Sequence, residues 1–502
     1  MRVPVASASY SLCVPSRHIR LDLPASTVPE RVRVAFARLR SELSIPDDFP
    51  PEVLDEAASS VHRDEHAGTR LDLRDLPFVT IDPAGSKDLD QAVHLSRSDD
   101  GGYVVDYAIA DVGRVVVPGG AVDTEAHLRG VTFYAPDGRT PLHPPVLSED
   151  GASLLPGVDR AAAAWRVVLD DRGEIVDVAV RRALVRSRAQ LTYTEVQEAL
   201  DAGTADENLV LLREVGALRE ARERDRGGVS IDVPEQSVTL HEDGSYSIEL
   251  RSVLPAEGWN AQISLLTGIA AASLMRAGEI GILRTLPASD PRDVDRLRRT
   301  ALAVGIDWPV EVPYAELLST LDSTVPQDAA FLNEATSLFR GAGYLAFTGP
   351  VPEGSEHAAI AAEYSHVTAP LRRLVDRYTT EICLALSAGE GAAGVPSWVT
   401  DAFADLPKTM ARSGQRASSF ERAGVDIVEA ALLTGRVGET FRGVVVDVDG
   451  KDPRKGVVVV DDPAVRGTLT SGSHDLPLGA PVTVELTEVS IESRKIRFSY
   501  GG

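Results

Sequence analysis

The segment Thr80-Ile81-Asp82-Pro83-Ala84-Gly85-Ser86-Lys87-Asp88-Leu89-Asp90-Gln91-Ala92 carries the strongest structural and chemical signal in this sequence. The apolar run Phe78–Ile81 predicts a strand that delivers Asp82 to a loop containing a proline, a glycine and a serine. After the loop, Asp88 and Asp90 occupy alternate positions of an extended segment, which places both side chains on one side. The sequence therefore predicts three carboxylates that converge at the end of a strand.

Three neighbouring carboxylates repel one another, so they need either solvent or a cation. Hard oxygen donors favour Mg²⁺, with Mn²⁺ as a second possibility. Magnesium retains water ligands, and such a water can act as the nucleophile in phosphoryl transfer. The same spacing also fits a solvated turn. It fits a calcium loop poorly, because Leu89 and Gln91 stand where calcium would need further ligands.

A second signal is the arginine-rich segment 363–378, EYSHVTAPLRRLVDRY. Pro370 predicts a helix start, with Thr368 as a possible cap. Arg372 and Arg373 would then lie in the first turn, where the helix dipole disfavours cations unless an anion such as a phosphate binds there. The alternative is an arginine that forms an ion pair with Asp376 on the same helix.

The rest of the chain divides into a β-rich, a helical and a second β-rich region. Short β-type runs occur at Phe78–Ile81, Val104–Ile109, Val115–Val117, Val131–Tyr134, Trp165–Leu169 and Ile175–Val180. Helical patterns follow over 194–223, 257–277, 290–304, 313–322, 327–346, 370–387 and 415–432. Five short strands then lie at 441–447, 456–460, 467–469, 482–486 and 495–498. Five strands in so short a stretch predict a small closed barrel, best matched by an OB-fold.

The N-terminal region predicts two helices. Thr27-Val28-Pro29-Glu30 forms a capping box, and an apolar stripe follows at Val32, Phe36, Leu39 and Leu43. A second helix is expected over about 52–61. Residues 1–45 contain seven arginines and three acidic residues, which fits either a solvated helix face or a surface that RNA approaches.

Composition narrows the class of protein. A chain of 502 residues with 43% hydrophobic and 25% charged residues is expected to be globular and to contain several domains. No membrane span, no secretory signal and no disulfide framework are predicted; the two cysteines, Cys13 and Cys383, instead favour a reducing cytoplasm. The net charge of −24 requires any nucleic acid to be bound in a locally positive channel.

Several blocks together resemble the catalytic (RNB) domain of the ribonuclease II and ribonuclease R family. Over about residues 45–430 the matching blocks keep the family's order: RDLPFVTIDPAGSKDLDQAV, YAIADVGRVVVPGGAVDTEAHLRGVTFYAPD, LLPGVDRAAAAW, RSRAQLTYTEV, RGGVSID, ILRTLP and AEYSHVTAPLRR. The final barrel resembles the S1-type RNA-binding module that follows this domain in the family. The resemblance implies an α+β fold with an N-terminal helical segment (1–70), an RNB domain with a mixed sheet (71–432) and an S1-like OB-fold (433–502).

The resemblance also implies an activity and roles for individual residues. The expected activity is processive 3′→5′ hydrolysis of single-stranded RNA to nucleoside 5′-monophosphates by a monomer, without a membrane or a small-molecule cofactor. Asp82, Asp88 and Asp90 match the metal-binding carboxylates, and Arg372 matches the arginine that stabilises the scissile phosphate. Tyr134 and Tyr193 match aromatic residues that contact the terminal nucleotides, although core tyrosines would give the same pattern. Further RNA contacts are expected from Arg284, Tyr364, His366 and Arg373, although a lone histidine is more often structural.

This sequence departs from the family pattern at several positions. Gln91 stands where a fourth aspartate is usual; it can hold a metal-bound water but adds no charge, which puts a second metal ion in doubt. Ile231 replaces an aromatic clamp opposite Tyr134, Ala261 and Gln262 replace a glutamate pair, and Leu374 replaces a common tyrosine. Only about 45 residues precede the match, so the family's two cold-shock domains are not expected in this sequence.

Two other functions also fit parts of the sequence. His62-Arg63-Asp64-Glu65-His66 fits the H-x-x-E-H pattern of a zinc peptidase, with both histidines on one helix face. A non-catalytic RNA-binding protein of the same fold is suggested by Gln91 and Ile231.

Overall fold

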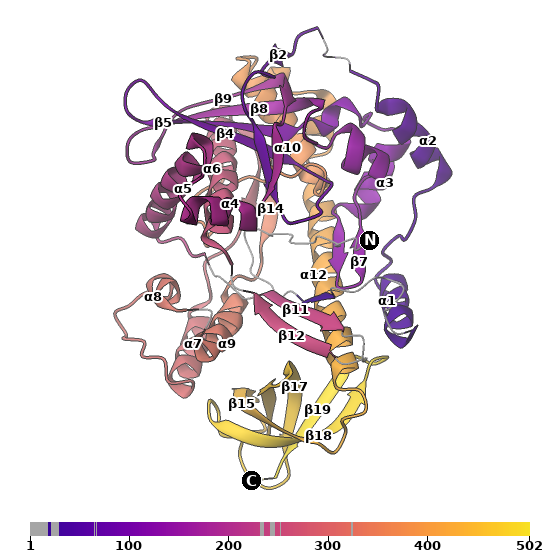
Figure 1. The fold of residues 1–502 in the computed structure, drawn as a ribbon, viewed down its shortest axis with the longest axis vertical. Helices are drawn as coiled ribbons and strands as arrows, with labels where there is room; N and C mark the ends of the chain where they lie inside the picture. The colour runs from indigo at the N-terminus through magenta and orange to yellow at the C-terminus, as the bar shows by residue number, and fades with distance from the viewer. Residues whose placement is uncertain are drawn as a thin grey trace.

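In this computed structural model the described residues are 19–21, 30–64, 66, 68–230, 235–240, 246–251, 253–322 and 325–501. The largest sheet lies at one end of the long axis and a β-barrel at the other, with helices around and between them (Figure 1). The α+β architecture predicted from the sequence is confirmed. Among the described residues, no helix combines the length and apolar character needed to cross a bilayer.

The largest sheet is mixed and has seven strands. Their order is β10 (Ala189–Thr192), β3 (Val79–Asp82), β4 (Gln91–Arg97), β5 (Tyr103–Ala110), β8 (Asp159–Leu169), β9 (Ile175–Arg186) and β2 (Leu71–Asp72). The central strands are antiparallel, whereas β10 pairs in parallel with β3 and β2 in parallel with β9. Each edge of the sheet is therefore formed by a strand that runs parallel to its neighbour.

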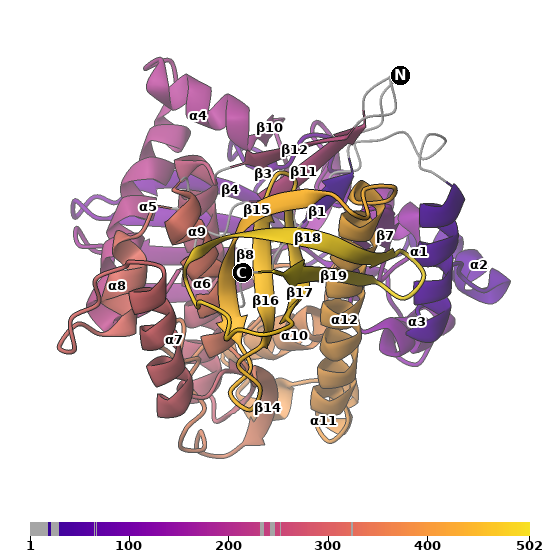
Figure 2. The same ribbon diagram turned by 90° about the horizontal axis from the view of Figure 1, so that it is seen from below.

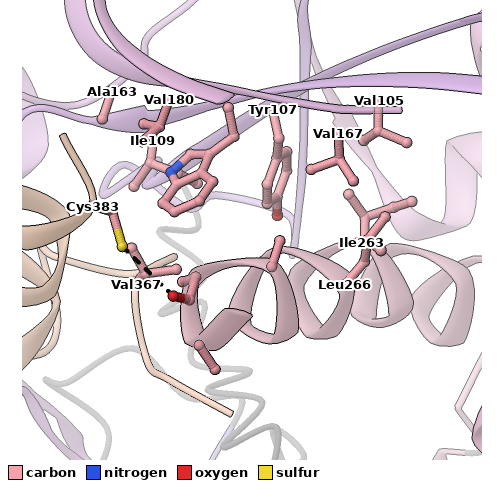
Figure 3. Packing of buried hydrophobic residues seen from close by; sticks show 14 of the residues in the cluster. Val105, Tyr107, Ile109, Ala163, Val167, Val180, Ile263, Leu266, Val367 and Cys383 are labelled. Carbon is pink, nitrogen blue, oxygen red and sulfur yellow. Dashed lines mark hydrogen bonds between the residues drawn. The ribbon is translucent and has the colours of Figure 1, made fainter. Parts of the chain in front are cut away.

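One face of the sheet carries large apolar side chains because these alternate along the strands with small ones. Tyr107 and Trp165 lie directly opposite each other on β5 and β8, and both are buried. They pack toward α5 (Glu207–Arg226), α6 (Pro255–Ala277) and α10 (Leu374–Ser387). Figure 3 shows Tyr107, Val105 and Val167 reaching from the strands toward Ile263 and Leu266 of α6. This layer is the main hydrophobic core.

The opposite face of the same strands carries alanines. The buried alanines of this face are Ala92, Ala108, Ala110, Ala162, Ala164 and Ala183. They share a cluster with residues of α2 (Pro51–Ser60) and α3 (Ala121–Arg129), and also with Leu89 and Leu371. Leu89 belongs to the acidic segment and Leu371 to the arginine-rich segment, so the methyl-lined face is where the two segments meet the sheet.

Further helices and short sheets complete the molecule outside the large sheet and the barrel. Five of these helices are α4 (Tyr193–Asp201), α7 (Pro291–Ala303), α8 (Tyr314–Thr320), α9 (Pro326–Ala335) and α11 (Ser397–Asp401). The smaller sheets pair β6 (Phe133–Ala135) with β7 (Gly138–Thr140), β13 (Ile280–Thr285) with β14 (Gly343–Thr348), and β1 (Ile19–Leu21) with β11 (Glu235–Leu240) and β12 (Tyr246–Arg251). Short helical turns occur at Val112–Arg114, Leu147–Gly151, Thr336–Leu338 and Ala392–Gly394.

Several predicted elements differ from the structure. The predicted strand Val115–Val117 is instead a turn after a 3₁₀ helix, because these apolar residues pack into the alanine-face cluster without a pairing strand. The helix predicted over 194–223 is two helices, separated near Gly203, whose φ of 67° a helix interior does not allow. The helix predicted over 327–346 ends early, and its last residues form β14 because they pair with β13.

The C-terminal barrel is closed and follows the order β15-β16-β17-β19-β18. Its strands are β15 (Thr440–Val448), β16 (Lys455–Asp461), β17 (Ala464–Ser471), β18 (Pro481–Ser490) and β19 (Lys495–Tyr500), which confirms the predicted five-stranded barrel. Figure 2 shows the barrel from below, with α12 (Leu406–Leu432) beside it. α12 packs against β18 and β19 at one end and against β6 farther along, so it connects the barrel to the upper part.

The helix predicted from the N-terminal apolar stripe is present as α1 (Glu30–Glu42), which packs on α12. Val32, Phe36 and Leu39 are buried in a cluster that also contains core residues of the barrel. The capping box at Thr27, Val28 and Pro29 lies outside the described residues.

We expect Phe36→Ala to lower the free energy of unfolding by about 3–5 kcal/mol, because it removes a fully buried ring and leaves a cavity. Val34→Ala is the matched control, since Val34 lies on the same helix and is 56% exposed. Denaturant titration of both variants provides the measurement. An equal, small effect of the two changes would contradict the packing of α1 described here.

Candidate active site

The acidic segment lies between β3 and β4. Asp82 is the last residue of β3, and Asp88 and Asp90 directly precede β4. Leu89, between them, is fully buried, and its backbone N–H donates to the Ser153 hydroxyl at 3.0 Å. The burial of Leu89 in the alanine-face cluster therefore fixes the two aspartates on either side of it.

The arginine-rich segment is bound to this acidic segment. Arg372 Nε donates to Asp90 Oδ2 at 2.8 Å, across 282 positions of sequence, and the backbone N–H of Leu371 donates to Asp90 Oδ1 at 2.8 Å. Gln91 Nε2 donates to the carbonyl oxygen of Thr368 at 2.5 Å. The structure thus brings the guanidinium of Arg372 onto the carboxylate of Asp90.

The helix in the arginine-rich segment begins later than predicted. α10 starts at Leu374, so Arg372 and Arg373 precede it rather than forming its first turn. Arg373 is extended because it bridges Val131, and the backbone N–H of Thr132 donates to the Arg372 carbonyl. The predicted pairing with Asp376 occurs for Arg373, through contacts of 2.9 and 2.7 Å, and leaves Arg372 to Asp90.

A second arginine, Arg139, also reaches the acidic segment, although the sequence analysis did not identify it. Arg139 lies directly opposite Tyr134 in the β6–β7 hairpin. Its guanidinium binds Asp88 through Nη1 and Glu149 through Nη2, the latter at 2.8 Å. An isolated arginine between Gly138 and Thr140 gave no signal in the sequence, because only the hairpin register turns it toward Asp88.

Charge and burial oppose each other at this site. The pKa of Asp82 is raised to about 7, mainly by burial, against the lowering effect of Arg372 and with smaller contributions from Asp90 and Asp88. Burial likewise raises the pKa of Asp90 to about 7 against the opposing effect of Arg372. Burial lowers the pKa of Arg372, but Asp90 outweighs this and raises it well above the ordinary value, so the guanidinium stays charged.

The donors of the site fit a hard divalent cation in kind. The carboxylate of Asp82 accepts no hydrogen bond from any residue that the structure describes, although it lies among buried groups. No set of three or more Asp, Glu, His or Cys side chains in the described ranges is arranged ready to hold a metal. Asp88 is paired with Arg139 and Asp90 with Arg372. A cation at Asp82 would therefore require shifts of the arginine side chains.

The two predicted nucleotide-contacting tyrosines flank the acidic segment. Tyr134 is half-buried on β6, close enough to Asp88, Arg372 and Arg139 for their charges to act on its hydroxyl. Tyr193 is the first residue of α4, and Asn260 donates to its hydroxyl at 3.4 Å. Tyr193 also packs against the main core, so the core interpretation fits it in part.

The other predicted RNA-binding residues form a second group. The Arg284 guanidinium lies 4.7 Å from the ring centre of Tyr344, whose hydroxyl bonds His366 Nδ1 at 2.7 Å. Tyr364 packs edge-on against His366, and Arg373 lies near both. Burial lowers the pKa of His366 well below its ordinary value, with Arg373 and Arg284 adding to the effect, so this histidine is neutral. Tyr344 was missed because it lies in the stretch predicted to be helical.

The zinc-peptidase pattern is not built as predicted. α2 ends at Ser60, so His62 and His66 follow the helix and share no helical face. Glu65 lies outside the described residues. The segment is instead tied down by Asp64, which pairs with Arg70 at 2.8 Å.

Two further departures from the family pattern can be located. Gln262 Nε2 donates to Glu223 at 2.6 Å in a buried pair on α6 and α5. Ile231 lies outside the described residues.

Comparison with family models decides the relationship. The RNB domain model matches residues 70–387, more than half of the chain, and the RNase II-type exonuclease C-terminal S1 domain model matches residues 439–501. This chain belongs to the RNB family. The acidic segment, Arg372 and both tyrosines of this RNB protein lie within the matched domain.

Known relatives of this RNB protein are longer. Ribonuclease R of Escherichia coli is 28% identical over 503 residues, which cover 91% of this chain and 60% of the relative. The structure of Mycoplasma genitalium RNase R in complex with ribose methylated single-stranded RNA superposes with a TM-score of 0.81 at 19% identity, covering 94% of this chain and 78% of that one. Yeast Ssd1, a pseudonuclease, superposes with a TM-score of 0.61 at 16% identity, covering 80% of this chain and 50% of Ssd1. The fold is therefore shared by nuclease and pseudonuclease alike.

Proposed function

We propose that this RNB protein is a 3′→5′ exoribonuclease that degrades single-stranded RNA processively to nucleoside 5′-monophosphates. The contact that carries the proposal is Arg372 Nε to Asp90 Oδ2 at 2.8 Å, because it sets a guanidinium beside carboxylates from a distant segment. Fixed positive charge next to the reacting phosphate usually contributes more to such catalysis than any other single effect. Ribonuclease R relatives matching 91% of the chain support the same activity.

In this mechanism Arg372 binds the scissile phosphate. Its Nε is used by Asp90, and its two Nη groups donate to no residue in the described ranges, which leaves them for phosphate oxygens. Asp90 orients the guanidinium and is itself held by the Leu371 N–H. Negative charge that develops on the phosphate is then balanced by the positive charge of this guanidinium.

Asp82, Asp88 and Asp90, with the amide oxygen of Gln91, are the proposed ligands of Mg²⁺ or Mn²⁺. When bound, the cation supplies Lewis-acid activation of a water and of the phosphate. The unpartnered carboxylate of Asp82 supports this assignment, and Gln91 is oriented by its bond to Thr368.

Tyr134 and Tyr193 are proposed to contact the last nucleotides, and Arg284, Tyr364, His366 and Arg373 to bind RNA nearby. Aromatic faces stack on any base, which suits an enzyme that degrades RNA without regard to sequence. The rigid placement of the second group supports the proposal, because Arg373 is fixed by Asp376 and His366 by Tyr344.

The test is a time course with 5′-labelled single-stranded RNA, in Mg²⁺ and in EDTA. A ladder that descends from the 3′ end, with nucleoside 5′-monophosphate as product and with no cleavage in EDTA, is expected. Internal cleavage, or activity unaffected by EDTA, would contradict the proposal.

A non-catalytic RNA-binding protein is the second candidate, suggested by Gln91 in place of a carboxylate. RNA binding by gel shift, without nucleotide release at any Mg²⁺ or Mn²⁺ concentration, would establish it. We also propose that the protein acts as a monomer. A cytoplasmic location is proposed as well, in keeping with the free thiol of Cys383, which is buried.

A further inference from the structure

We propose that Arg139 supplies positive charge that a second divalent cation would otherwise provide, so that the site of this protein takes one divalent cation. The inference rests on the proposed metal site and concerns its stoichiometry. Arg139 is placed by the β6–β7 hairpin and binds Asp88 and Glu149 together.

The position of Arg139 is fixed rather than incidental. The hairpin strand β6 packs on α12, and the backbone on its N-terminal side is joined to the arginine-rich segment at Arg372 and Arg373. At the hairpin turn, Arg40 binds Asp137 through two contacts of 2.8 and 2.9 Å. The side chain of Arg139 is only 18% exposed, so its charge acts within the site and little of it is lost to solvent.

The local charges match one divalent cation. A bound cation requires ionised carboxylate ligands, and in that state Asp82, Asp88, Asp90 and Glu149 contribute four negative charges. Arg139 and Arg372 contribute two positive charges. The remaining two negative charges equal the charge of a single divalent cation. A second cation would leave the site with a net positive charge and would stand near the two guanidiniums, which opposes its binding.

Gln91 acts in the same direction as Arg139. Its amide is neutral, and its Nε2 is engaged with the Thr368 carbonyl, so it adds no charge for a second cation to neutralise. The two residues differ in how they act. Arg139 adds a positive charge, whereas Gln91 lacks the negative charge that an aspartate would carry at that position.

The experiment counts Mn²⁺ ions bound by the full chain, by equilibrium dialysis and by the electron paramagnetic resonance signal of free Mn²⁺. Sites elsewhere on this acidic protein are subtracted using Asp82→Asn. The wild type is expected to bind one ion. Arg139→Met is expected to bind it at least about tenfold more tightly, because an adjacent positive charge is removed. Arg139→Met combined with Gln91→Asp is expected to bind two.

Arg166→Met is the control, because it removes an arginine of the same domain that pairs with Asp106 and does not touch Asp88. It should leave both the ion count and the affinity unchanged. Two ions in the wild type would overturn this inference and leave the proposed nuclease intact. No Asp82-dependent ion in the wild type would overturn the metal site of the proposed function as well. Unchanged affinity in folded Arg139→Met would also overturn the role given to Arg139.

Discussion

Asp90→Asn is expected to lower the rate of RNA hydrolysis by on the order of 10²–10³ or more while leaving RNA affinity intact. Asp90 is 1% exposed and accepts from both the Leu371 N–H and Arg372 Nε. Asparagine keeps the size of the side chain but removes its charge, so one proposed metal ligand is weakened. The electrostatic partner that holds the Arg372 guanidinium is lost at the same time.

Single-turnover cleavage of a 3′-overhang RNA measures the rate, and fluorescence anisotropy measures binding. Asp106→Asn is a suitable control, because Asp106 is a buried aspartate of the same sheet that pairs with Arg166 away from the site. Wild-type cleavage by Asp90→Asn would show that the residue is wrongly assigned.

Arg372→Ala should reduce the rate by about 10²–10³, the loss typical when one donor to a transition-state charge is removed. The alanine variant also leaves Asp90 without its guanidinium, so the local negative charge rises and substrate phosphate is repelled. Arg372→Lys should recover only part of the rate, because an ammonium cannot bind Asp90 and present a planar fork to the phosphate at once.

Addition of guanidinium ions to Arg372→Ala gives a direct readout of this role, since a soluble guanidinium can occupy the vacated position. Partial recovery is expected for the alanine variant and none for Asp90→Asn. An alanine variant as active as the wild type would leave Arg372 with a structural role only.

Elements could be predicted from the sequence where their own local pattern of apolar and polar residues determines them. The barrel strands alternate buried and exposed residues, and the stripe at Val32, Phe36 and Leu39 fixes α1. Both can be predicted because the pattern is local. The family resemblance placed Asp90 and Arg372 in one active site, but their ion pair was not predicted, since no local rule connects residues 282 positions apart.

Features set by tertiary pairing could not be predicted. β14 lies in a stretch whose local pattern predicts helix, and its pairing with β13 comes from distant chain. The start of α10 moved past Arg373 because a bridge to Val131 holds that residue extended. Arg139 went unnoticed for the same reason: its direction depends on the register of a hairpin, and single-residue identity does not reveal register.

The small size of the alanines that pack with Leu89 and Leu371 determines how close the acidic and arginine-rich segments lie to the sheet. Each methyl lets the acidic and the arginine-rich segments settle close to the strands, and Asp90 and Arg372 are separated by whatever spacing that layer permits. Enlarging Ala108 or Ala164 would overpack this layer and force the backbone of either segment to shift. We expect activity to fall while most of the core stays intact. These alanines therefore contribute to catalysis by setting the position of the two segments.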